Sequence, residues 1–220
     1  MSASLHKFPS LRALLACALL APLPISAQPI SVTREAPVVT RIEFERERPP
    51  PSMPKLTPPE SGVCDTTFEL AAGIGYSLEV TGAGSIKMWV EKIDMVTRQR
   101  IDIYTLAGAP AKLRAHEEGH RAISEHYYAN AAVVARVAAT PLIGKMFTGS
   151  GATRGAAEKD AQSKVLAVIE QAYMTRMRGP SVAANARFDE LTQHGLNGFD
   201  EAEAIALAIG SGLAAAAGAR

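Results

Sequence analysis

The sequence predicts an α+β fold, with a small antiparallel β-meander followed by a bundle of helices. Two observations predict it. Between Cys64 and Tyr104, short runs of alternating apolar and polar residues are separated by glycine-containing breaks, as in a meander. After Pro110, apolar residues recur with the helical period almost to the end of the chain. Strands that come first and helices that follow favour an α+β fold over a parallel α/β sheet.

The first 27 residues have the pattern of a secretory signal peptide. Lys7 and Arg12 give a positive start, residues 14–23 are apolar, and residues 25–27 supply a small-residue cleavage site. The apolar run is too short to cross about 30 Å of hydrocarbon as a helix. We therefore expect an exported protein, periplasmic or secreted, with no stable membrane span once the leader is removed.

Residues 28–62 are predicted to form a proline-rich arm or linker ahead of a folded domain at residues 63–220. Proline removes backbone donors and favours extended, solvated chain. Alternation over residues 38–44 still allows a short strand that docks on the domain. The prolines include Pro49, Pro50, Pro51, Pro54, Pro58 and Pro59.

Four β-like runs make up the expected meander, and four helices follow it. The break at residues 82–84 has two glycines and the chemistry of a hairpin turn. Gly179 and Pro180 are expected to end the second helix, and Asp200 to cap the last one. The expected strands are 66–71, 76–81, 86–95 and 100–104, and the first three expected helices are 111–138, 156–178 and 182–193.

The charge and cysteine content limit the possible partners and stabilising bonds. The formal net charge is +1, and loss of Lys7 and Arg12 with the leader brings it to −1. A chain with this balance has no broad basic surface for nucleic acid, so no nucleic-acid partner is expected. Cys17 lies in the leader, which leaves Cys64 as the one mature cysteine and allows no internal disulfide.

The main chemical motif lies in the first predicted helix, where residues 116–120 read His-Glu-Glu-Gly-His and satisfy the pattern His-Glu-x-x-His. Four residues advance a helix by about 400°, so the rings of His116 and His120 lie on one face, about 40° apart. Zinc takes neutral imidazole nitrogens at about 2.0–2.1 Å. Glu117 would point past the metal toward a water and serve as its general base. The pattern predicts a zinc site with His116 and His120 as ligands.

A catalytic zinc needs a third protein ligand and one open position. The other mature histidines are His126 and His194. His126 lies six residues after His120, about 600° around the helix, and faces away. His194 stands at a helix end before Gly195 and can reach another element, although a histidine there also simply favours the negative end of the helix dipole.

Carboxylates provide the alternatives for the third ligand. Asp189 or Glu190 could bind the metal directly or orient a ligand from behind. Glu125 is a weaker candidate because it lies about half a turn from His116. The residues alone leave this choice open.

The two motifs together resemble a family of exported bacterial proteins described as zinc-dependent peptidases. The second motif, at residues 188–195, reads aromatic-Asp-x-x-Thr-x-His-Gly, and the resemblance covers residues 64–195. It implies a zincin-like α+β domain, Glu117 as catalytic acid and base, and His194 as third ligand. Phe188 stands where a tyrosine is usual, and Leu191 where an acidic residue is common.

The sequence therefore predicts a secreted zinc-dependent hydrolase, and most simply a metallopeptidase acting on a peptide or protein substrate. Extended peptides could pair with an exposed edge of the meander. The alternative is an exported binding or structural protein with a non-catalytic metal site, and hydrolysis of another amide, such as one in the cell wall, is also compatible with these residues.

Overall fold

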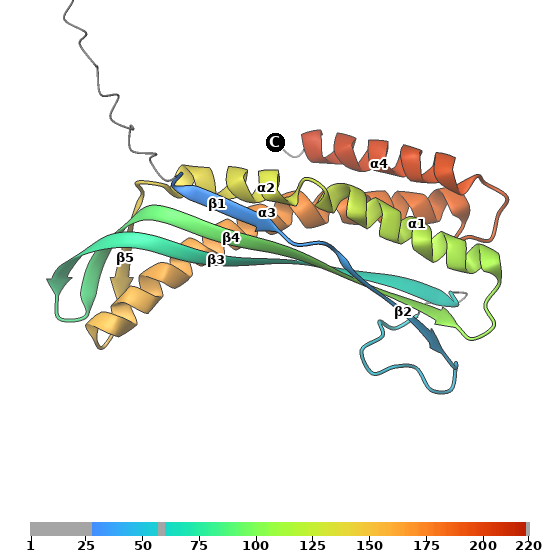
Figure 1. Ribbon diagram of the computed structural model, residues 1–220, viewed down its shortest axis with the longest axis horizontal. Coiled ribbons are helices and arrows are strands. Elements are labelled where there is room, and N and C mark those ends of the chain that lie inside the picture. Colours follow the sequence, from blue (N-terminus) through green and yellow to red (C-terminus); the bar gives the residue numbers. More distant parts are fainter. Residues whose placement is uncertain (1–27, 57–59, 219–220) are drawn as a thin grey trace, which may run out of the picture.

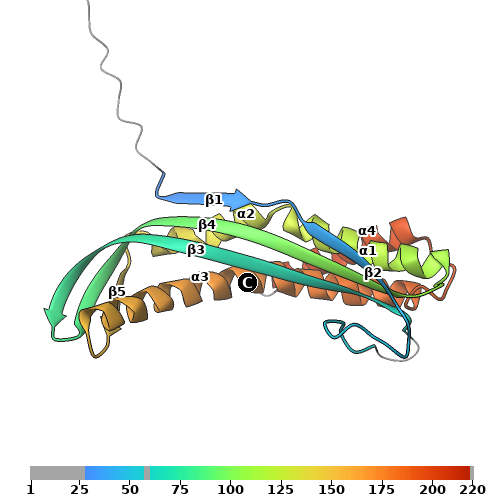
Figure 2. The same cartoon turned by 60° about the horizontal axis from the view of Figure 1, so that its bottom comes forward.

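The computed structural model describes residues 28–56 and 60–218, and the predicted leader lies outside them. It contains one curved five-stranded sheet, with four α-helices gathered along one side of it (Figures 1 and 2). The strands are β1 (Ile30–Arg34), β2 (Val38–Phe44), β3 (Gly62–Gly82), β4 (Ser85–Leu106) and β5 (Met146–Ser150). The helices are α1 (Ala111–Tyr128), α2 (Ala131–Ala139), α3 (Arg154–Thr192) and α4 (Glu201–Gly218), with a 3-10 turn at Thr140–Leu142.

Strand β4 is the centre of the sheet. β3 runs antiparallel along the whole of one edge, from Gly62 opposite Thr105 to Gly82 opposite Ser85. On the other edge, β5, β1 and β2 follow one another end to end, β5 antiparallel and the other two parallel to β4. No strand among the described residues pairs with the outer edge of β3.

The predicted small antiparallel meander followed by a separate helical bundle is wrong, although the fold remains α+β. Two of the four strand pairings are parallel, because β1 and β2 from the proline-rich segment join the sheet. β5 comes from between two helices and joins it as well. The strand expected at residues 38–44 is confirmed, but much of the expected arm belongs to the sheet. Long-range pairing of this kind leaves no periodic signal in the sequence beyond the strand itself.

The four expected short strands are two long ones. Apolar and polar positions alternate almost without interruption along β3 and β4, and the predicted break at residues 82–84 is their hairpin, where Gly84 has a φ of +78°. A bulge leaves Glu91 without a partner, since Gly75 pairs with Lys92 and Tyr76 with Val90. The buried positions of β4 accordingly change from even to odd numbers at this point, which keeps one face against the helices.

Helix α3 continues through Gly179 and Pro180, where the sequence predicted an end. Proline inside a helix costs about 3 kcal/mol. A buried stripe at roughly every fourth residue runs along the entire helix, so burial against the sheet and α4 outweighs that cost. The stripe consists of Ala157, Ala161, Val165, Ile169, Tyr173, Met177, Pro180, Ser181, Ala184, Phe188 and Thr192.

The helix ends are set by local chemistry. The expected helix over residues 111–138 is two helices, which break at Ala129 and Asn130. Asp200 accepts a hydrogen bond from the backbone N–H of Glu203 at 2.9 Å, so the predicted cap of α4 is confirmed. No helix in the described part of the chain has the length and apolar character needed to cross a bilayer.

An ion-pair network fixes α1 against the N-terminal part of the sheet. Arg41 of β2 makes a two-pronged bond to the carboxylate of Glu118, at 2.6 and 3.0 Å. Arg121 of α1 bonds both Glu118 and Glu125. These contacts lie on the side of α1 that faces β2, here called its outer side. The side that faces α3, its inner side, carries His116 and His120.

Candidate metal centre

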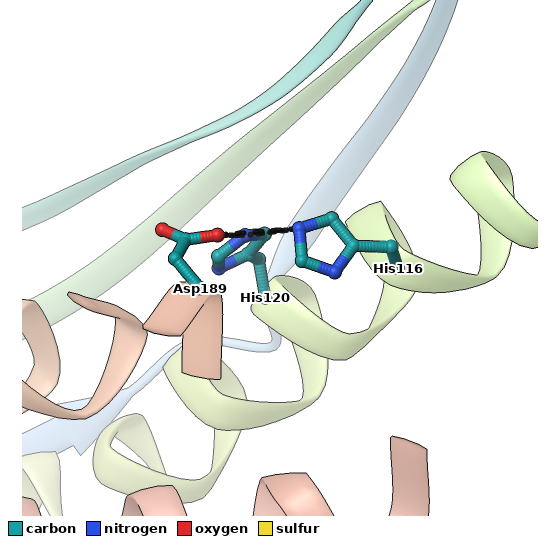
Figure 3. Close-up of side chains that lie close together, drawn as sticks. All are labelled: His116, His120 and Asp189. Carbon is teal, nitrogen blue, oxygen red and sulfur yellow. Dashed lines mark hydrogen bonds and ion pairs between the residues drawn. The ribbon is translucent and has the colours of Figure 1, made fainter. Parts of the chain in front are cut away.

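The two histidines of α1 are brought together as their spacing predicts. His116 is buried and His120 is nearly so, and their Nε2 atoms lie 3.1 Å apart. Both rings lean toward α3, which crosses α1 on this side (Figure 3). Because one helical turn separates them, the backbone of α1 places both side chains on the same face.

Asp189 of α3 completes a group of three. Its Oδ1 atom lies 3.2 Å from Nε2 of His116 and 3.0 Å from Nε2 of His120 (Figure 3). Two nitrogens and one carboxylate oxygen are a donor set that zinc accepts, and ligands at 2.0–2.1 Å in tetrahedral geometry lie about 3.3 Å from one another. The three atoms therefore fit a metal ion with little movement, and this group could hold one.

His194 lies beside this group rather than in it. Its Nδ1 is 3.4 Å from Oδ1 of Asp189 and 3.9 Å from Glu60, and 48% of its side chain is exposed. Three successive residues with positive φ, Gln193, His194 and Gly195, turn the chain sharply after α3. The structure thus brings Asp189, one of the carboxylate alternatives, to the position for which the second motif implied His194.

The other candidate ligands lie elsewhere. Glu190 is exposed and pairs with Arg187 at 2.8 Å. Glu125 pairs with Arg121, and the ring of His126 lies edge-on to Tyr127 at 5.4 Å. None of these three belongs to the group that could hold an ion.

Phe188 provides an aromatic wall behind the histidines, which the sequence did not reveal. Its ring stacks on His116 with centroids 4.8 Å apart and meets His120 edge-on at 5.0 Å. A Cβ at position 119 would lie 2.5 Å from Cζ of this ring, so only glycine fits between the two histidines. A Cβ at position 195 would likewise lie 3.0 Å from Cβ of His116. Close packing therefore explains Gly119, and Gly195 is explained by this contact together with its φ of +77°.

The second nitrogen of each histidine also has a partner on α3. Nδ1 of His120 lies 2.8 Å from Oδ1 of Asn185, and Nδ1 of His116 lies 3.4 Å from the hydroxyl of Thr192. With Phe188 and Asp189, these residues occupy one face of α3 over two turns. Asn185 lies outside the second motif, and only its helical spacing from Asp189 could have indicated it.

Glu117 is buried next to the group, with 3% of its surface exposed. Its Oε2 atom has no hydrogen-bond partner among the described residues. Burial raises the pKa of this carboxyl to about 7, and the negative charges of Asp189 and Glu60 add to the shift against the opposing effect of His120. A carboxyl with this pKa can both take up and release a proton near neutral pH.

Room for the Glu117 carboxyl is provided by Gly62, the first residue of β3. A Cβ there would lie 2.7 Å from Oε1 of Glu117. Gly62 therefore borders the space of the Glu117 carboxyl, and any side chain at position 62 would displace this carboxyl.

The charges of the group favour a cation at its centre. Burial raises the pKa of Asp189, but bonds with His116 and His120 outweigh this and hold it well below its usual range. Burial lowers the pKa of His120, and the bond and charge of Asp189 outweigh this in turn and raise it. A carboxylate thus stays ionised beside two imidazoles and attracts positive charge.

The group opens into a cleft of about 710 Å³. The cleft is bounded by the first residues of β3, the inner side of α1, the C-terminal part of α3 from Arg178 onward and the turn that follows. Cys64 also lines it, and burial, with the charge of Glu117, raises the pKa of its thiol to about 12. A thiol with this pKa stays protonated, so Cys64 is no nucleophile at neutral pH.

The chain matches no protein-family model, no curated protein and no solved structure. The resemblance to exported zinc-dependent peptidases therefore stays a prediction from two short motifs. The chemistry open to this site follows from the geometry of its own residues.

Proposed function

We propose that this chain is an exported zinc-dependent hydrolase that cleaves peptide bonds. One observation carries the proposal: two imidazole nitrogens and a carboxylate oxygen lie 3.0–3.2 Å from one another, next to the buried Glu117, whose Oε2 atom has no hydrogen-bond partner in the described part of the chain. Three protein ligands leave a fourth position open, as catalytic zinc sites do. A purely structural site would close all four positions.

The ligands in this proposal are His116, His120 and Asp189. Zinc, when bound, supplies Lewis acidity to a carbonyl oxygen and to the water that attacks it. Asp189 balances part of the ion's charge, and Phe188 keeps water away from the rear of both imidazoles. His194 lines the cleft beside these ligands and is half exposed.

Glu117 moves the proton. Its carboxylate accepts the proton of the attacking water and returns it to the nitrogen of the leaving amine. In the metal-free chain, burial raises the pKa of this carboxyl to about 7, which favours proton uptake. Gly62 leaves room for this carboxyl, because a Cβ there would lie 2.7 Å from Oε1.

The proposal of a peptide substrate rests on the strand that borders the cleft. The first residues of β3 line the cleft, and the outer edge of this strand has no strand partner among the described residues. An extended peptide can add to such an edge by main-chain hydrogen bonds. The cleft would then receive the side chains on one face of the peptide.

Zinc content and turnover test the proposal together. The purified chain should contain one zinc per molecule, and His116→Ala, His120→Ala and Asp189→Ala should each lose it. Glu117→Gln should keep the zinc and lose hydrolysis of a mixed peptide library. Glu118→Gln is the matched control, because Glu118 is the next residue but bonds Arg41 and Arg121 on the outer side of α1.

Three results would contradict the proposal. A folded chain that takes up no zinc would exclude the metal site. Stoichiometric zinc with equal turnover in the parent and in Glu117→Gln would exclude the role of Glu117, and zinc with no hydrolysis in any form would favour a binding or structural protein.

A further inference from the structure

We propose that Asn185 and Thr192 set the metal affinity of this site by holding both histidines in the tautomer that presents Nε2. Neither side chain is a ligand. The inference rests on the metal site of the proposed function but not on its peptidase activity.

Asn185 can only accept a hydrogen bond from His120. Its amide nitrogen Nδ2 donates to the backbone carbonyl of Ser181 at 2.9 Å, which fixes the orientation of the amide group. Its Oδ1 atom therefore faces Nδ1 of His120 at 2.8 Å. Since an amide oxygen has no proton to give, Nδ1 of His120 must carry one. The lone pair of the ring is then on Nε2.

Thr192 constrains His116 in the same way. The hydroxyl of Thr192 donates a hydrogen bond to the carbonyl of Phe188, one turn earlier, at 2.7 Å. The hydroxyl oxygen is left as an acceptor for Nδ1 of His116, at 3.4 Å. Nδ1 of His116 thus carries the proton, and its lone pair also lies on Nε2.

The two tautomers bring only acceptors together at the centre of the group. Both Nε2 lone pairs and the Oδ1 of Asp189 lie within 3.2 Å of one another. Such an arrangement is unfavourable unless positive charge lies between the atoms, as a proton or a metal ion supplies. Asn185 and Thr192 therefore prepare the donor set for a cation before it arrives.

The spacing of these residues makes the arrangement a property of one helix. Residues 185, 188, 189 and 192 are related by three or four positions and share a face of α3. They supply, in order, an acceptor for His120, the aromatic wall, the ligand and an acceptor for His116. Because one rigid segment carries all four, a single packing of α3 on α1 positions them together.

Zinc affinity in conservative variants tests the inference. Asn185→Leu and Thr192→Val remove the acceptors and should each weaken zinc binding by about 10- to 100-fold, measured by competition with a chromophoric chelator. Asn185→Asp and Thr192→Ser keep an acceptor oxygen and should bind within a few-fold of the parent. Thr175→Val is the matched control, because Thr175 makes the same bond to the carbonyl four residues earlier, on an exposed part of α3.

Nitrogen NMR of the zinc-loaded parent gives a readout that is independent of affinity. Both ligand histidines should be protonated at Nδ1 and coordinated through Nε2. Metal-free melting temperatures of the variants close to that of the parent would show that they fold.

Each outcome decides the inference. Folded Asn185→Leu and Thr192→Val chains with the zinc affinity of the parent would overturn it, as would coordination of either histidine through Nδ1. A parent that binds zinc tightly but cleaves no peptide would refute the proposed activity and leave this inference intact. A parent that binds no zinc would overturn both.

Discussion

Substitution of Gly119 by alanine gives a direct measure of how tightly the site is packed. The new Cβ would lie 2.5 Å from Cζ and 2.8 Å from Cε1 of Phe188, whereas carbon atoms in contact normally lie about 3.5–4.0 Å apart. The Phe188 ring must withdraw by about 1 Å, but it is fully buried and stacked on His116. We therefore expect the substitution to strain the ring and to turn both histidines.

The magnitude follows from two opposing contributions. Overpacking of this kind costs about 1–3 kcal/mol. Replacing glycine by alanine inside a helix gains about 1 kcal/mol where nothing obstructs the methyl group. Gly210 of α4 is such a position, because no atom lies within 4 Å of a Cβ built there. Gly119→Ala should therefore be less stable than Gly210→Ala by about 1–3 kcal/mol, the overpacking cost alone.

Urea denaturation of the metal-free chain measures this difference. The Phe188→Leu variant lacks the terminal ring atoms. In this background, the difference in stability between Gly119→Ala and Gly210→Ala should fall to near zero. Zinc affinity should drop in Gly119→Ala and remain unchanged in Gly210→Ala. Equal stabilisation by the two alanines in the parent background would refute the packing of Phe188 against Gly119.

Three further predictions concern the same site. Gly62→Ala should keep its zinc and lose at least 10-fold in peptide turnover, because the methyl group would lie 2.7 Å from Oε1 of Glu117; unchanged kcat would contradict this contact. The metal-free chain should lose on the order of 1–3 kcal/mol of stability as pH rises from about 4.5 to about 7. Folding raises the pKa of Glu117, so over this range the folded chain keeps the proton on Glu117 and the unfolded chain releases it. Denaturation at several pH values should show this slope in the parent and a flatter one in Glu117→Gln. Zinc at about 1,000 times its dissociation constant should add about 4 kcal/mol, which raises the melting temperature by about 8–16 °C, and Asp189→Ala should abolish the shift seen in a thermal scan.

Local features of this protein were predictable from the sequence. The spacing of His116 and His120 fixes their common face within one helix. The strand at residues 38–44, the hairpin at residues 82–84 and the cap at Asp200 depend on neighbouring residues only. Each was found where the pattern indicated.

Features that depend on the packing of distant segments were not predictable. Asp189 and His194 lie five residues apart, and the choice between them depends on how α3 crosses α1 and on the left-handed turn at Gln193 and His194. The parallel pairing of β1 and β2 with β4 has no local signature. Pro180 misled the helix prediction, because the burial that compensates for it comes from elements elsewhere in the chain.

Pro180 also gives α3 a position at which the helix can bend. The helix has 39 residues and is about 58 Å long. The proline nitrogen cannot donate to the carbonyl of Arg176, so resistance to bending is lowest there. The twelve residues after it hold Asn185, Phe188, Asp189 and Thr192 in constant mutual geometry. A small rotation of the helix at Pro180 would therefore move these four residues together, toward or away from His116 and His120. Such a rotation would change the distance from Asp189 to the two histidines, and with it the affinity for an ion, while the geometry within each helix stays the same.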